Sequence, residues 1–140
     1  MPIFIRAIAM IGLFILLGCT EPITPIKVGV VLPLTGTFSV YGEKALKGAQ
    51  LAVEQINAGG GVNNRQIELI VRDNQTDPAK TVAYTRELIQ QHNVHALLGP
   101  VSSSARYVMS ELANKYKIPM LYGIDYEGGH YEDYLICYSS

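Results

Sequence analysis

Residues 26–58 read IKVGVVLPLTGTFSVYGEKALKGAQLAVEQINA, and this stretch carries the pattern that decides the fold. It opens with a nearly continuous β-branched run, which is typical of a strand buried on both faces of a parallel sheet. Pro33 and Gly36 then indicate a loop. From about Val40 to Ala58, apolar residues recur at spacings of three and four, which predicts an amphipathic helix. A strand followed directly by a helix is the first half of a βαβ unit.

The rest of the chain repeats this alternation. Over residues 67–72, every second side chain is apolar and the others are partly polar, so one face of the strand is partly polar. This pattern is typical of an edge strand. Asp77 and Pro78 are a helix N-cap and a first helical residue. Later segments are predicted as a strand at 95–99, a helix at 105–116 and a strand at 118–122. Such alternation favours right-handed crossovers, so the expected fold is α/β, a doubly wound parallel sheet with strand order 2-1-3-4.

The amino-terminal segment predicts export. An apolar run at residues 7–17 follows Arg6 and is too short to span a bilayer, as expected of a secretory signal peptide. Leu16 to Cys19 read LLGC, which resembles the bacterial lipobox. We therefore expect a signal peptide at 1–18, a lipidated Cys19 and a proline-containing tether at 19–25. A plain signal peptide or an uncleaved anchor is the alternative. Cys137 then has no disulfide partner in the chain.

The carboxyl-terminal stretch affects the expected domain organisation. Another apolar segment, residues 134–138, predicts a further strand with no helix after it. A sheet of four or five strands with three helices is incompletely covered, so residues 26–140 are interpreted as part of a larger domain. A complete small domain ending on a short edge strand is the alternative.

Candidate binding groups follow the predicted strands, because ligands bind beyond the carboxyl ends of parallel strands. The turn GPVSSS, residues 99–104, leads into a helix whose free backbone N–H groups and dipole attract negative charge. The hydroxyls of Ser102, Ser103 and Ser104 suit this position to a carboxylate, an amide oxygen or a urea carbonyl. Helix capping alone is the alternative. Aromatic and acidic groups beside the same edge favour a small-molecule pocket. These groups are Tyr122, Asp125, Tyr126 and Glu127.

Several motifs in order resemble one family. Residues 26–69, then RDNQTDPAKTV and LLGPVSSSAR, look like the type I periplasmic binding proteins of the Leu/Ile/Val-binding group. The segment LYGIDYEGG is most similar to the amide- and urea-binding branch. The resemblance implies two lobes, of which this chain supplies the first part of the N-terminal lobe. It also implies a substrate-binding lipoprotein in the periplasm or at the cell surface that delivers a small polar solute (a short amide, urea or an amino acid) to an ABC transporter permease.

The same resemblance implies ligand contacts for individual residues. Ser103 falls where the family holds a carboxylate or amide at a helix N-terminus, and Tyr41 falls on an aromatic position that covers the ligand. Tyr122 matches a pocket tyrosine of the amide-binding branch. Ile124 and Tyr126 fall where the family places contacts after the fourth strand, although Ile124 offers no polar side chain.

Other functional classes find little support. A net charge of −1 gives no basic surface for nucleic acid. A hydrolase would need a Gly-x-Ser-x-Gly elbow, which the turn at residues 99–102 does not supply. His130, Glu132 and Asp133 lack metal-ligand spacing and are typical of a solvated turn. We therefore expect no enzyme, cofactor or metal. A ligand-sensing domain of a receptor or regulator with the same fold remains the alternative.

Overall fold

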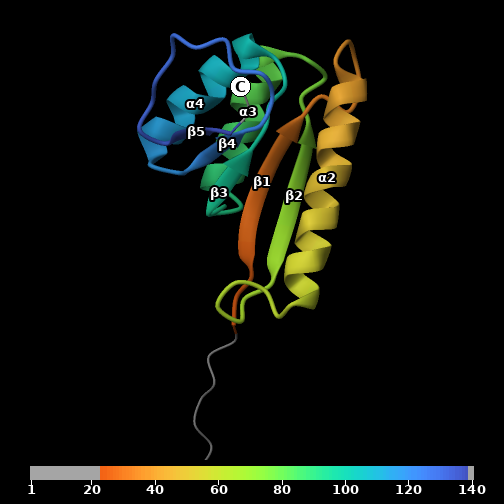
Figure 1. Ribbon diagram of the computed structural model, residues 1–140. Helices are drawn as coiled ribbons and strands as arrows, with labels where there is room; N and C mark the ends of the chain where they lie inside the picture. The colour runs from red at the N-terminus through yellow and green to blue at the C-terminus, as the bar shows by residue number, and fades with distance from the viewer. Residues whose placement is uncertain (1–22, 139–140) are drawn as a thin grey trace, which may run out of the picture.

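Five parallel strands form one sheet in the computed structural model, which describes residues 23–138 (Figure 1). The strands are β1 (Ile26–Leu32), β2 (Ile67–Asp73), β3 (Ala96–Leu98), β4 (Met120–Tyr122) and β5 (Leu135–Cys137), in the order β2-β1-β3-β4-β5. The helices are α2 (Ser39–Ala58), α3 (Pro78–Gln90) and α4 (Ser103–Tyr116). The predicted doubly wound sheet and its edge strand β2 are confirmed, and β5 extends the order at the other edge.

The β-branched run of β1 is explained by its place between β2 and β3. Val31 joins a core on the side of α3 and α4, whereas Val30 and Leu32 join a core on the side of α2. Successive side chains of a strand point to opposite faces, so a central strand needs apolar residues at every position. Each of these three residues is buried.

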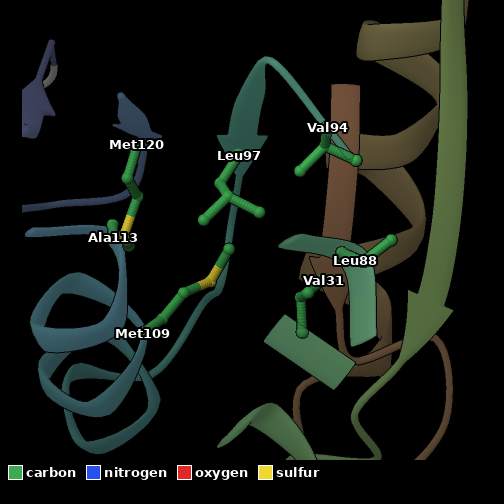
Figure 2. Close-up of a cluster of buried hydrophobic side chains, with 7 residues drawn as sticks. All are labelled: Val31, Leu88, Val94, Leu97, Met109, Ala113 and Met120. Carbon is green, nitrogen blue, oxygen red and sulfur yellow. The ribbon is translucent and has the colours of Figure 1, made fainter. Parts of the chain in front are cut away.

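The larger core lies between the sheet and the helices α3 and α4. Figure 2 shows Met109 and Ala113 of α4 pointing toward Leu97 of β3 and Met120 of β4, with Leu88 of α3 further along the same layer. All of these residues are buried. The stripe that predicted the helix at 105–116 is thus the face that packs on the sheet.

The other face is covered only in part. Helix α2 packs against β1 and β2, and Gly42 is its one buried residue. Val30, Leu32 and Val101 form the small core beneath it. Past β1, on the same face, the surface is hollowed.

Both predicted helix starts have capping side chains. Asp77 Oδ1 accepts a hydrogen bond from the Ala79 N–H at 2.7 Å, and Pro78 follows at the first helical position. Ser102 Oγ accepts from the Ala105 N–H at 3.4 Å at the start of α4. Among residues 23–138, no helix has the length and apolar character that crossing a membrane requires. The predicted signal peptide and Cys19 lie outside the described residues.

Candidate functional site

The site is built at the carboxyl edge of the sheet, where the segments after β1, β3 and β4 meet. Asp73, the last residue of β2, holds the first of these segments. Its Oδ1 accepts from the backbone N–H groups of Leu34 at 2.8 Å and Thr35 at 3.2 Å, and its Oδ2 accepts from the Thr35 hydroxyl at 2.6 Å. No local sequence pattern indicates this role of Asp73, because these partners lie 39 and 38 residues away in the chain.

Helix α4 follows the turn at residues 99–104 as predicted, whereas a ligand contact of its serines stays a prediction. Ser102 is the N-cap and uses its hydroxyl for the cap, so Ser103 is the first helical residue. The Ser104 side chain is exposed, and its Oγ lies 3.4 Å from that of Ser102. Ser102 makes the cap and the Ser103 hydroxyl donates to the Glu127 carboxylate, so a solute at Ser103 would share or replace that contact. The unused N–H groups of this first turn add donors and a positive dipole end.

A hollow of about 580 Å³ reaches Gly99 and Pro100, which precede α4, but Ser103 and Ser104 are not among the residues that line it. At the carboxyl edge of the sheet, the hollow is lined by Tyr41 of α2, Pro100 of the turn after β3, and Ile124 of the segment after β4. Tyr41 is 59% exposed, and its ring meets that of Phe38 edge-on at 6.4 Å between centroids. The structure thus brings two of the predicted site residues, Tyr41 and Ile124, to one hollow.

The hollow continues along α2 past its small side chains and over the uncovered sheet face. It is lined there by Ala45, Gly48, Ala49 and Ala52, opposite Leu98. This part is mostly apolar, and Lys44 of α2 also lines the hollow and adds one cation.

Tyr122 and Tyr126 form a second group, outside the lining of that hollow. Tyr122 is only 1% exposed and donates its hydroxyl to the Val101 carbonyl at 3.0 Å. Burial raises the pKa of Tyr122. The Tyr126 hydroxyl bonds the backbone of His130, accepting from its N–H at 3.1 Å and donating to its carbonyl. Direct contact of either tyrosine with a ligand therefore stays a prediction.

Glu127, one of the acidic groups predicted beside the pocket, pairs with Arg106, which no sequence pattern assigned to the site. Arg106 Nη2 lies 2.9 Å from Glu127 Oε1. A hydrogen bond from the Ser103 hydroxyl lowers the pKa of Glu127, as do its own backbone N–H and Arg106. The start of α4 thus already has an ionised carboxylate beside it at neutral pH.

The histidines lie apart from the serine triplet. His130 Nε2 lies 2.8 Å from the Ser110 hydroxyl, and His92 lies 3.2 Å from Glu87. Within residues 23–138, no group of three or more His, Cys, Asp or Glu side chains is placed to hold a metal ion. Cys137 is a free thiol in this part of the chain, and burial raises its pKa. The polar groups at this edge can bind and orient a small molecule.

Comparison with known proteins identifies the class of protein. A family model described as periplasmic binding protein matches residues 25–140, and the chain belongs to that family. Its members are binding proteins and not enzymes, in agreement with the sequence prediction.

Individual relatives are of the Leu/Ile/Val-binding kind. The chain is 30% identical to Leu/Ile/Val-binding protein homolog 7 of Brucella suis over 105 residues, covering 75% of this chain and 26% of the relative. It matches LivJ, a branched-chain amino acid transporter substrate-binding protein of Streptococcus pneumoniae in complex with isoleucine, at a TM-score of 0.75 and 35% identity. That match covers 81% of this chain and 33% of LivJ.

A second solved structure carries a different ligand. An ABC transporter solute-binding protein of R. palustris in complex with benzoate matches at a TM-score of 0.64 and 32% identity, covering 70% of this chain and 27% of that one. The chain thus spans about a quarter to a third of the length of these relatives.

Proposed function

We propose that this chain is the first part of the solute-binding component of an ABC transporter, and that it captures a small polar solute for delivery to the permease. The observation that carries the proposal is the start of α4. Backbone N–H groups of its first turn and the hydroxyls of Ser103 and Ser104 follow directly on Gly99 and Pro100, which line one hollow together with Tyr41 and Ile124.

The first candidate solute is an amino acid with an apolar side chain. The donors at the start of α4 suit its carboxylate, and the apolar hollow suits its side chain. The relatives in complex with isoleucine and with benzoate support this choice, since both ligands combine a carboxylate with an apolar group.

The second candidate is a short amide or urea. Glu127 supports it, because this carboxylate already lies beside Ser103 and Arg106 and would repel a second carboxylate. The sequence segment LYGIDYEGG supports the same class. A neutral amide would accept from the helix N–H groups and donate to Glu127.

The test uses nuclear magnetic resonance, which detects weak binding. Isoleucine, benzoate, acetamide and urea are titrated separately into the purified, isotopically labelled chain, and the backbone amide signals of residues 103–106 are followed. We expect one class to shift these signals, and the class decides between the two candidates. If none of the four shifts them, the proposed site is wrong.

Ser103→Ala tests the polar contact itself. Removal of one hydrogen bond should weaken the binding of the active solute by about 1–3 kcal/mol, more for a charged solute. Ser102→Ala is the matched control, because it removes the helix cap and lowers stability by about 1 kcal/mol without removing a solute contact. Equal affinity of Ser103→Ala and the unaltered chain would remove Ser103 from the site.

We further propose that the protein is lipid-anchored through Cys19 in the periplasm or at the cell surface, on the strength of the LLGC motif after a short apolar run. Cys19→Ala should release the protein from the membrane fraction. Globomycin, which blocks lipoprotein signal peptidase, should leave the precursor uncleaved. Unchanged processing and fractionation under both treatments would contradict the anchor.

A further inference from the structure

Arg106, in the first turn of α4, has a buried side chain that contacts a carboxylate and three aromatic rings. Its side chain is completely buried, and Nη2 lies 2.9 Å from Glu127 Oε1. Its guanidinium carbon lies 4.8 Å, 5.2 Å and 4.7 Å from the ring centroids of Tyr107, Tyr122 and Tyr126, respectively. One carboxylate and three aromatic rings therefore surround the cation.

A buried cation destabilises a protein unless other groups compensate for its lost hydration. Here the compensation comes from Glu127 and from the ring faces, which attract a cation. Within the described structure, Nε and Nη1 of Arg106 have no hydrogen-bond partner. Glu127 is thus the one anion paired with Arg106, although the Glu127 side chain is itself 49% exposed. If the segment that carries Glu127 moved away, a buried charge would be left unpaired.

These contacts join the start of α4 to the segment between β4 and β5. Arg106 lies three residues after Ser103 on α4, whereas Tyr126 and Glu127 belong to the segment between β4 and β5, residues 123–134. In Figure 1 this segment is the long blue loop that runs past α4. The same segment carries Ile124, which lines the hollow.

We propose that Arg106 is a positioning residue, which fixes segment 123–134 against the start of α4 through Glu127 and Tyr126. It thereby sets the distance between the donors of the first turn of α4 and Ile124 on the other side of the site. The inference rests on the proposed function only in that it concerns the same site. The order of segment 123–134 can be measured without any solute, so the two proposals fail separately.

The first experiment compares two surface glutamates by hydrogen–deuterium exchange of the full chain. Glu127→Gln removes the charge that neutralises Arg106 and preserves the side-chain shape. Glu87→Gln is the matched control, since Glu87 pairs with Arg72 at 2.6 Å with both side chains 27% exposed, remote from the site.

We expect amide exchange in residues 123–134 to accelerate about tenfold or more in Glu127→Gln, because segment opening no longer separates an ion pair. In Glu87→Gln the same amides should exchange at the unaltered rate. Exchange in Glu127→Gln within about twofold of the unaltered chain would overturn the proposal.

The second experiment is a chemical rescue. Arg106→Ala leaves a space between three tyrosine rings and Glu127 that fits a free guanidinium ion. We expect faster exchange of residues 123–134 in this variant, and its reversal by millimolar guanidinium but not by urea, which has the same shape without the charge. Two outcomes with a folded Arg106→Ala variant would contradict a positioning role for the cation. In the first, neither guanidinium nor urea slows the exchange; in the second, both slow it equally. If the variant does not fold, the comparison of the two glutamates decides.

Discussion

Asp73 shows at the scale of one residue how a side chain at a strand end organises a distant loop. Burial by itself would raise the pKa of Asp73, but hydrogen bonds from the Thr35 hydroxyl and from the N–H groups of Gln75, Leu34 and Thr35 outweigh it and lower the pKa. A carboxyl group with a lowered folded-state pKa stabilises the fold above its unfolded value, about 3.9. That stabilisation is lost as the pH falls through the folded pKa.

Asp73→Asn should therefore lower the free energy of unfolding by about 1–3 kcal/mol at pH 7, where the charged acceptor is lost. The difference from the unaltered protein should begin to shrink as the pH falls below about 4, because Asp73 of the unfolded chain is then protonated, and it should be smallest below the lowered pKa of folded Asp73. Urea denaturation of the two proteins at a series of pH values measures the loss of stability at pH 7 and its decrease at low pH. A difference that is equally large at pH 7 and pH 3 would contradict this role of the charge.

The residues most easily predicted from the sequence were those that act locally. Asp77 caps a helix through the N–H two residues further on, and Ser102 acts over three residues. Asp73 and Arg106 were not found, because their partners come from other segments of the chain. Glu127 was noticed only as an acidic group beside the predicted pocket.

Helix α2 gives a prediction at the scale of one element, because two of its glycines have opposite surroundings. A Cβ on Gly42 would lie 2.0 Å from the Pro33 carbonyl oxygen, whereas a Cβ on Gly48 would meet no atom within 4 Å. The first glycine lets α2 approach the loop after β1, and the second has no such role in the described structure.

Gly42→Ala should lower the free energy of unfolding by about 1–3 kcal/mol, since α2 or the loop must shift to relieve the clash. Gly48→Ala should raise it by up to about 1 kcal/mol, because alanine favours a helix over glycine. Chemical denaturation measures the free energy of unfolding of both variants and of the unaltered protein. Equal stability of Gly42→Ala and the unaltered protein would mean that this contact does not hold α2 in place.

Periodicity predicted the helices well and their buried faces less well. The stripe of α4 matches its buried face, with Ala105, Met109, Leu112 and Ala113 all inside. In α3 the buried residues include Thr81 and Thr85, which no apolar pattern indicates. Thr81 is buried because its hydroxyl donates to the Asp77 carbonyl at 2.9 Å and accepts from Asn74 Nδ2 at 2.9 Å.

At the scale of the whole molecule, the two faces of the sheet differ in coverage. Helices α3 and α4 cover one face, whereas α2 covers the other only over β1 and β2. The remaining hollow is mostly apolar and open to solvent. Parallel sheets are normally covered on both faces, so this surface should bind apolar molecules.

Ala49→Glu should reduce the fluorescence of the apolar dye anilinonaphthalene sulfonate bound to the protein, because Ala49 lines the hollow and an ionised side chain there would oppose apolar binding. Gln50→Glu is the control, since it adds the same charge to the adjacent, exposed position of α2. Equal dye binding by the two variants would show that the hollow is not the dye-accessible surface.

The sequence by itself determined the strands and the helices, because hydrophobic periodicity and helix caps are local properties. The edge pattern of β2 and the crossover rule predicted the order 2-1-3-4, and the structure placed β5 beside β4. It also predicted where a site would lie, since the carboxyl ends of parallel strands meet at one edge. Only the tertiary structure decided which side chains meet there. Tyr41 and Ile124 line one hollow, whereas Tyr122 is buried against Arg106. The physical reason is that burial and the pairing of charges depend on segments that are distant in the chain and become neighbours only in the folded sheet.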